Sequence, residues 1–170
     1  MYFVILTYMF KLFKAFLQRK TLLYQSLFGE GDDIHPILSQ NQSFDYRLYS
    51  DKYHKITGEV KIITKSQVQD SMYNSRHYKL NPKIKFYSKC IYLDASFEII
   101  NPEFISFLTN ELKNSLFVFF KHPWRDCIYD EVLECNKITK YDLGKLNGRS
   151  EYYKSINYPK HFGLYCGGCF

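Results

Sequence analysis

Short apolar runs recur along this chain, and glycine, proline, charged or polar residues bound each of them. Such runs are typical of strands that are buried in a sheet. The run at 90–94 has strong strand character and ends in a single acid, Asp94, which two small residues follow. The sequence predicts strands at 22–28, 44–49, 59–64, 90–94 and 116–120, and the start of another within 163–170.

Between these runs, apolar residues recur every three or four positions, which is the spacing of one face of a helix. Pro102 suits the start of one such helix, and Asp126 suits the N-cap of the next. Pro82 interrupts the pattern at 67–86, where a helix is expected in the second half. Further helices are predicted at 102–112, 128–138 and 148–156. Strands that alternate with helices predict an α/β sandwich with a mostly parallel central sheet, in one domain at 21–170.

The first 20 residues form a separate apolar segment. Residues 1–10 are apolar, and lysine and arginine follow them. This run is about half of the roughly 20 residues that a membrane span needs, and its charges lie on the wrong side for a signal peptide. We expect an amphipathic helix that docks on the domain or makes peripheral membrane contact, with a degenerate signal anchor as the less favoured alternative. The expected location is cytoplasmic or membrane-associated.

The composition narrows the function classes. The 170 residues are 46% hydrophobic, which is enough to bury a core. The net charge of +6 is scattered, and no arginine-rich arm or zinc-finger spacing points to nucleic acid, so we expect no nucleic-acid partner. The five cysteines form no obvious disulfide framework, and the Cys166–Cys169 pair lacks a second pair that would complete a zinc site.

Asp94 is the first candidate for a functional residue. Ligands in open α/β sheets bind beyond the carboxyl ends of the strands, which is where this acid is expected. A carboxylate there can hold a metal ion or accept a hydrogen bond from a sugar or ribose. The alternative is an aspartate that only caps the turn after its strand.

Five segments at 22–170 carry a further pattern. In chain order they read LLYQSLFGEGDDIHP, FDYRLYSDK, NSRHYKLNPKIKFYSKCIYLDASFEI, LFVFFKHPWRDCIYDEVLECNK and YPKHFGLYCGG. This series resembles the mucilage-related, TOD-type glycosyltransferase-like family, which has plant, bacterial and viral members. The fourth segment, with its Lys-His-Pro-x-Arg stretch before a Glu-bearing helix, is the most specific match.

The resemblance implies a GT-A-like, Rossmann-like domain that binds a nucleotide sugar. It implies a glycosyltransferase of the hexosyltransferase type, which moves a sugar from a nucleotide-diphosphate donor to a glycan or lipid hydroxyl. Asp94 would act in catalysis and hold a divalent cation, Mn²⁺ or Mg²⁺, against the diphosphate. Two features depart from the family: Ser96 stands where many GT-A enzymes have a second Asp, and the chain stops at Phe170, C-terminally short of the family's later motifs.

Two further residues are expected in catalysis. His122 follows an apolar run and precedes a proline, so it is expected in a loop near the edge of the sheet, where it binds a phosphate oxygen or sugar hydroxyl or has a structural role. Glu131 lies on the following helix and is expected to accept a proton from an acceptor hydroxyl. Glu134, three residues later on the same helix, is the other glutamate that could do so, and a solvated helix face is the favoured interpretation for it.

Five residues are expected to bind the substrate. Arg76 and Lys79 lie three apart, hence on one face of a helix, from which they either reach a diphosphate or form a surface ion pair. Arg125 shares the loop of His122, with the same two interpretations. Asp32 and Asp33 either contact the nucleotide or only form an acidic turn.

A second function is kept beside the transferase. The single acid at Asp94 and the short C-terminal end suit a non-catalytic or remnant domain that binds a nucleotide sugar or glycan and acts through a partner. A third, lipid amide hydrolysis, ranks last because no Ser-His-Asp order or metal cluster supports it.

Overall fold

The computed structural model of the chain describes residues 20–30, 33–62, 70–82, 87–138 and 143–170. These residues form two compact units. The first unit comprises the described residues up to 118 together with 168–170, and the second comprises those from 119 to 167. The domain predicted at 21–170 includes both units, and the helix predicted at 1–20 falls almost wholly outside the described residues. None of the described helices is long and apolar enough to cross a bilayer.

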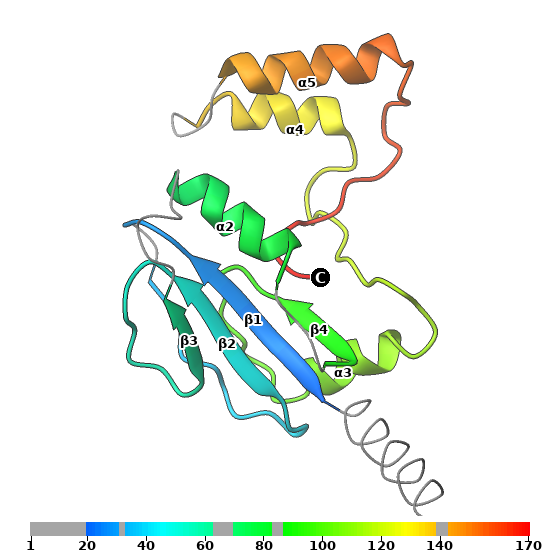
Figure 1. Cartoon of the computed structure of the whole chain (residues 1–170). Coiled ribbons are helices and arrows are strands. Elements are labelled where there is room, and N and C mark those ends of the chain that lie inside the picture. Colours follow the sequence, from blue (N-terminus) through cyan, green and yellow to red (C-terminus); the bar gives the residue numbers. More distant parts are fainter. Residues whose placement is uncertain (1–19, 31–32, 63–69, 83–86, 139–142) are drawn as a thin grey trace, which may run out of the picture. The chain divides into compact units, whose positions relative to one another are not determined.

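A four-stranded, all-parallel sheet forms the centre of the first unit (Figure 1). Its strand order is β3-β2-β1-β4, so β1 lies between β2 and β4. The strands predicted at 22–28, 44–49, 59–64 and 90–94 are confirmed with shifted ends. Their observed bounds are Thr21–Leu27 for β1, Asp45–Ser50 for β2, Glu59–Ile62 for β3 and Lys89–Tyr92 for β4.

Both faces of the sheet are covered, which explains why β1 is apolar without alternation. Side chains alternate across a strand. Leu23 and Leu27 therefore pack on the face with α3 (Phe104–Glu111), while Leu22 and Tyr24 pack on the other face with Tyr78 of α2 (Ser71–Leu80). All seven residues of β1 are buried. The unit is thus an α/β sandwich with helices on both faces, as predicted.

Helix α2 begins earlier than the sequence predicted. Asp70 caps it, because a carboxylate oxygen accepts the backbone N–H of Met72 at 2.9 Å. The helix ends at Leu80, two residues before Pro82, since a residue that precedes proline disfavours the helical conformation. The helix expected in the second half of 67–86 is present at 77–80 but begins earlier, because the cap at Asp70 sets the start, and 83–86 lie outside the described residues.

The end of the chain hydrogen-bonds to β4 on the side away from β1. Tyr92 and Phe170 exchange backbone hydrogen bonds of 2.7 and 3.2 Å, and Asp94 N–H donates to the Gly168 carbonyl at 2.7 Å. Leu93 and Cys169 form an isolated antiparallel bridge. The strand start predicted within 163–170 is therefore a short antiparallel pairing that covers the β4 edge.

In the described part of the second unit, α4 (Ile128–Cys135) and α5 (Leu143–Ser155) pack on each other. They correspond to the helices predicted at 128–138 and 148–156, with the first shorter and the second longer than expected. The predicted N-cap was wrong by one residue. Cys127 occupies the cap position, and the Asp126 carboxylate contacts His161 at 2.8 Å instead.

The strand predicted at 116–120 was wrong. No strand forms there, and the side chains of Leu116 and Phe117 are 90% and 72% exposed. The run crosses from the first unit to the second at residue 118. An apolar run forms a strand only where a neighbouring strand can pair with it. In the first unit the edge of the sheet at β4 is already paired with residues 168–170.

Candidate functional site

A polar cluster lies at the carboxyl ends of β1 and β4. The chain passes from β1 outward to β2 and β3, then crosses back to β4 on the other side of β1. This change of direction makes the β1–β4 junction the topological switch point, where ligands of open α/β sheets bind. The acid after β4, Asp94, belongs to this junction.

The Asp94 carboxylate is engaged by two donors of the first unit. Lys79 Nζ lies 3.1 Å from Oδ1, and the Tyr92 hydroxyl donates to the same oxygen at 2.5 Å. The Lys79 ammonium also lies 4.5 Å from the centre of the Tyr92 ring. Burial, and then the charge of Asp94, raises the pKa of Tyr92 far above its usual range, so its hydroxyl remains a donor. The result is an ion pair whose lysine side chain is 19% exposed and whose aspartate is 37% exposed.

A buried amide fixes the backbone of Asp94. Gln25, in the middle of β1, is fully buried and donates from Nε2 to the Asp94 carbonyl at 3.3 Å. The Tyr46 hydroxyl in turn donates to Gln25 Oε1. Because both amide atoms of Gln25 have partners, the turn after β4 is held at the sheet through β1 and β2.

The loop after β1 is held by the ends of two other elements. Gly29 N–H donates to Asp51 Oδ2, just beyond β2, at 3.0 Å. Gly29 has a positive φ of 81°, and a Cβ there would lie 2.8 Å from Ser71 Oγ at the start of α2. Only glycine fits this position without strain. The second oxygen of Asp51, Oδ1, is buried and has no hydrogen-bond partner among the described residues.

The predicted residues of the first unit are only partly brought together. Lys79 reaches Asp94, but Arg76, one turn earlier on α2, is exposed, and no contact with Asp94 is described for it. Asp33 is exposed in the loop after β1, and Asp32 lies outside the described residues. Asp51 was missed, although its place directly after a predicted strand is the same signal that singled out Asp94.

A cavity of about 420 Å³ lies at the opposite edge of the sheet. Asp45 at the start of β2, Gly58 before β3 and Tyr87 before β4 line it. Its acid is already paired, because the Tyr87 hydroxyl donates to Asp45 Oδ2 at 2.8 Å. The cavity lies at the amino ends of the strands, where parallel sheets rarely bind ligands. Its described lining residues include no lysine or arginine, although Lys20 Nζ lies 3.4 Å from Asp45 Oδ2.

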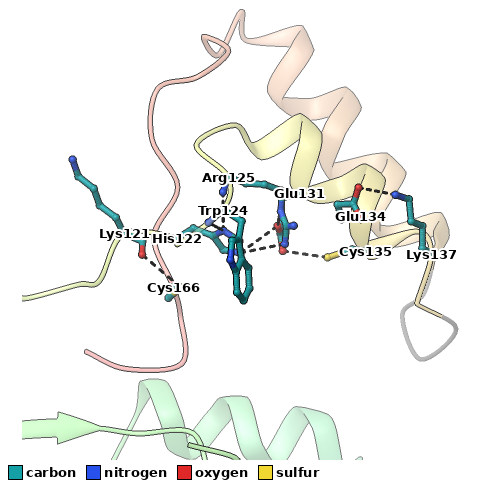
Figure 2. Close-up of polar contacts among 9 residues, drawn as sticks. All are labelled: Lys121, His122, Trp124, Arg125, Glu131, Glu134, Cys135, Lys137 and Cys166. Atoms are coloured by element: carbon teal, nitrogen blue, oxygen red, sulfur yellow. Dashed lines mark hydrogen bonds and ion pairs between the residues drawn. The ribbon is translucent and has the colours of Figure 1, made fainter. Parts of the chain in front are cut away.

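The other predicted site residues form a network within the second unit, shown in Figure 2. His122 Nδ1 accepts the backbone N–H groups of Trp124 and Arg125 at 3.3 and 3.1 Å. Arg125 Nε donates to Glu131 Oε2, and His122 Nε2 lies 3.7 Å from the same oxygen. Cys135 Sγ lies 3.5 Å from the other oxygen, Oε1.

In the structure, this network connects a loop to a helix. Glu131 has donors on both carboxylate oxygens, and the network ties the loop at 121–126 to α4. Neighbouring Glu134 pairs with Lys137 at 2.7 Å on the exposed side of the same helix, as a solvated face would. His122 and Asp94 belong to different units, so a shared site for them stays a prediction, as does proton transfer by Glu131.

The expected divalent cation is not matched by the surroundings of Asp94. One carboxylate, with Oδ1 shared by an ammonium and a hydroxyl, falls short of the several free oxygens that Mg²⁺ or Mn²⁺ prefers. Ser96 replaces the second acid. Among the described residues, the group of three potential metal ligands is Cys127, Asp130 and His161, which does not include Asp94.

No model of a known protein family, no curated protein and no solved structure matches this chain. Any function must therefore be inferred from the fold and from the geometry of the candidate site.

Proposed function

We propose that the first unit is the donor site of a GT-A-like glycosyltransferase and binds a nucleoside-diphosphate sugar at the carboxyl ends of β1 and β4. One observation carries the proposal: the Asp94–Lys79 ion pair lies at the point where the strand order reverses. The loop after β1, which Gly29 and Asp51 hold in place, borders the same edge of the sheet.

Lys79 supplies the positive charge that the diphosphate needs. A sugar transfer breaks the bond between the anomeric carbon and the diphosphate, and negative charge builds up on the leaving group. The Lys79 ammonium is held by Asp94 Oδ1 and over the ring of Tyr92, so it is oriented before the ligand binds. Since Asp94 does not fit a divalent cation, donor binding in this proposal is independent of metal.

Asp51 offers the second contact to the donor. Its Oδ1 is a buried acceptor with no partner among the described residues, and an unsatisfied buried acceptor is costly. A ribose or sugar hydroxyl would satisfy it. The acceptor substrate is a hydroxyl of a glycan or lipid, which attacks the anomeric carbon as the nucleoside diphosphate leaves.

A non-catalytic domain that binds the same ligand is the second candidate. The observation that favours it is the state of Asp94, whose carboxylate is already neutralised by Lys79 and hydrogen-bonded to Tyr92. Such a carboxylate serves to position the Lys79 ammonium. Both candidates require nucleotide-sugar binding, and only the first requires turnover.

Calorimetry of the full chain against uridine, guanosine and other nucleoside-diphosphate sugars tests the proposal, with EDTA in one series and Mn²⁺ in the other. We expect binding in both series, and we expect Lys79→Met to weaken it about tenfold or more, as loss of a charged hydrogen bond does. Lys113→Met is the matched control, because Lys113 is exposed in the same unit. Equal affinity of the Lys79 variant and the control, or binding only with Mn²⁺, would contradict the proposal. Release of nucleoside diphosphate during incubation with acceptors separates the two candidates.

A further inference from the structure

Three side chains of types that can bind metals lie together in the second unit. Cys127 is the N-cap residue of α4, Asp130 lies in the first turn of that helix, and His161 comes from the segment after α5. One ligand atom from each of the three lies within 4.8 Å of the other two. The cluster belongs to the second unit, whereas Asp94 belongs to the first, and nothing in the proposed donor binding uses the cluster.

The backbone holds the two segments together at this point. Gly163 N–H donates to the Asp126 carbonyl at 2.9 Å, and the Tyr129 hydroxyl donates to the Tyr158 carbonyl at 2.8 Å. Between these two contacts, His161 has a φ of 53°, in the left-handed region that residues other than glycine rarely adopt. The segment therefore bends in an uncommon way that keeps His161 beside α4.

Asp126 orients the ring of His161. Its Oδ1 lies 2.8 Å from Nδ1 of the imidazole. A histidine that binds a metal through one ring nitrogen usually donates the N–H of the other to a carboxylate or carbonyl, which fixes its tautomer and orientation. With Nδ1 held by Asp126, Nε2 is the ring nitrogen left for a metal.

The third member, Cys127, is 1% exposed. The thiolate is the form in which this side chain binds metal.

We propose that Cys127, Asp130 and His161 bind one Zn²⁺ ion, with Asp126 as a positioning residue for His161. A thiolate, an imidazole and a carboxylate are ligands that zinc accepts, and the soft sulfur selects against Mg²⁺ and Ca²⁺. Ligand atoms on a tetrahedral zinc ion lie about 3.3–3.8 Å apart, so the side chains close from the present limit of 4.8 Å when the ion binds. Binding releases the Cys127 proton to solvent. Three protein ligands leave the fourth position to water, as in catalytic zinc sites.

Cobalt binding to the full, reduced chain tests this site, because Co²⁺ replaces Zn²⁺ and reports a thiolate ligand by a charge-transfer band. We expect one equivalent of Co²⁺ to bind with that band and with the visible bands of four-coordinate cobalt, and we expect Zn²⁺ to displace it. Cys127→Ser should lose the charge-transfer band. Asp126→Asn should keep the band and weaken the affinity about 10–100-fold.

Cys127 is buried, so its variant can fail by misfolding. His161→Ala and Asp130→Asn change exposed side chains and avoid that difficulty, and each should weaken Co²⁺ binding while circular dichroism is unchanged. Cys166→Ser is the matched control for a half-buried thiol of the same unit and should bind Co²⁺ as the wild type does. Full binding by the His161 and Asp130 variants, loss of the band in the Cys166 control, or no band in the wild type would overturn the zinc site.

Discussion

Gln25 is a fully buried polar side chain in the central strand, and its two amide atoms connect three strands. It accepts a hydrogen bond from Tyr46 of β2 and donates one to the carbonyl of Asp94 beyond β4. A buried amide is stable only while its hydrogen bonds are made. The sequence pattern predicts a strand at 22–28. It does not show which polar residue of that strand hydrogen-bonds to the turn after β4.

Loss of the Tyr46 hydroxyl should therefore destabilise the first unit. Tyr46→Phe leaves Gln25 Oε1 buried without a donor, which costs about 1–3 kcal/mol in the free energy of unfolding. Urea denaturation measures the change. Tyr53→Phe is the control, because the Tyr53 side chain is 73% exposed and its hydroxyl can bond to water in either state. Equal denaturation midpoints for the two variants would show that the Gln25 bond adds no stability.

His54 should give the protein a pH dependence of stability. Burial first, and then Lys52, lowers the pKa of His54 below its ordinary value of 6.5, against the opposite effect of Asp51. Below pH 6.5 the unfolded chain therefore binds more protons than the folded one, so stability falls as the pH falls from 6.5 toward the folded-state pKa. Above pH 6.5 the contribution is complete.

The measurement is urea denaturation of wild type and His54→Gln from pH 8 to pH 5. The wild type should lose more stability than the variant over the acidic half of this range. A variant whose stability changes with pH as steeply as that of the wild type would show that His54 is not the group responsible.

Among the elements, the apolar pattern predicted strands and helices correctly where the folded chain provides a strand to pair with or a face to pack on. The strands at β1, β2, β3 and β4 and the helix at α3 follow the pattern to within a few residues. The pattern failed at 116–120, which is apolar but exposed at Leu116 and Phe117. The start of α2 depends on a single capping side chain, Asp70, which a pattern of apolar residues does not reveal.

The cap of α2 should contribute measurable stability. Asp70→Ala removes the carboxylate that accepts the Met72 N–H, and loss of such a cap costs about 0.5–2 kcal/mol. The matched control is Glu103→Ala, since Glu103 occupies the N-cap position of α3 without a side-chain hydrogen bond to that helix. Chemical denaturation of both variants gives the comparison. A cost for Glu103→Ala as large as that for Asp70→Ala would contradict the role assigned to the cap.

At the scale of the whole molecule, the sequence predicted an α/β sandwich with a parallel sheet, and the acid after its last strand proved to lie at the switch point. It did not predict the pairing of Asp94 with Lys79, because this contact depends on where α2 begins and crosses the sheet. Nor did it predict the Cys127, Asp130 and His161 cluster, whose members come from segments on either side of α5. Residues far apart in the chain become neighbours only through the fold.

We expect a nucleotide sugar to bind at the carboxyl ends of β1 and β4. Titration of the ¹⁵N-labelled chain with a nucleoside diphosphate, followed by NMR, tests it most directly, because each backbone amide reports its own surroundings. We expect the shift changes to concentrate at Gly29, Lys79 and Asp94, and to spare the cavity at the opposite edge, which Asp45 and Gly58 line. Shift changes centred on that cavity, or none at millimolar ligand, would contradict the donor site.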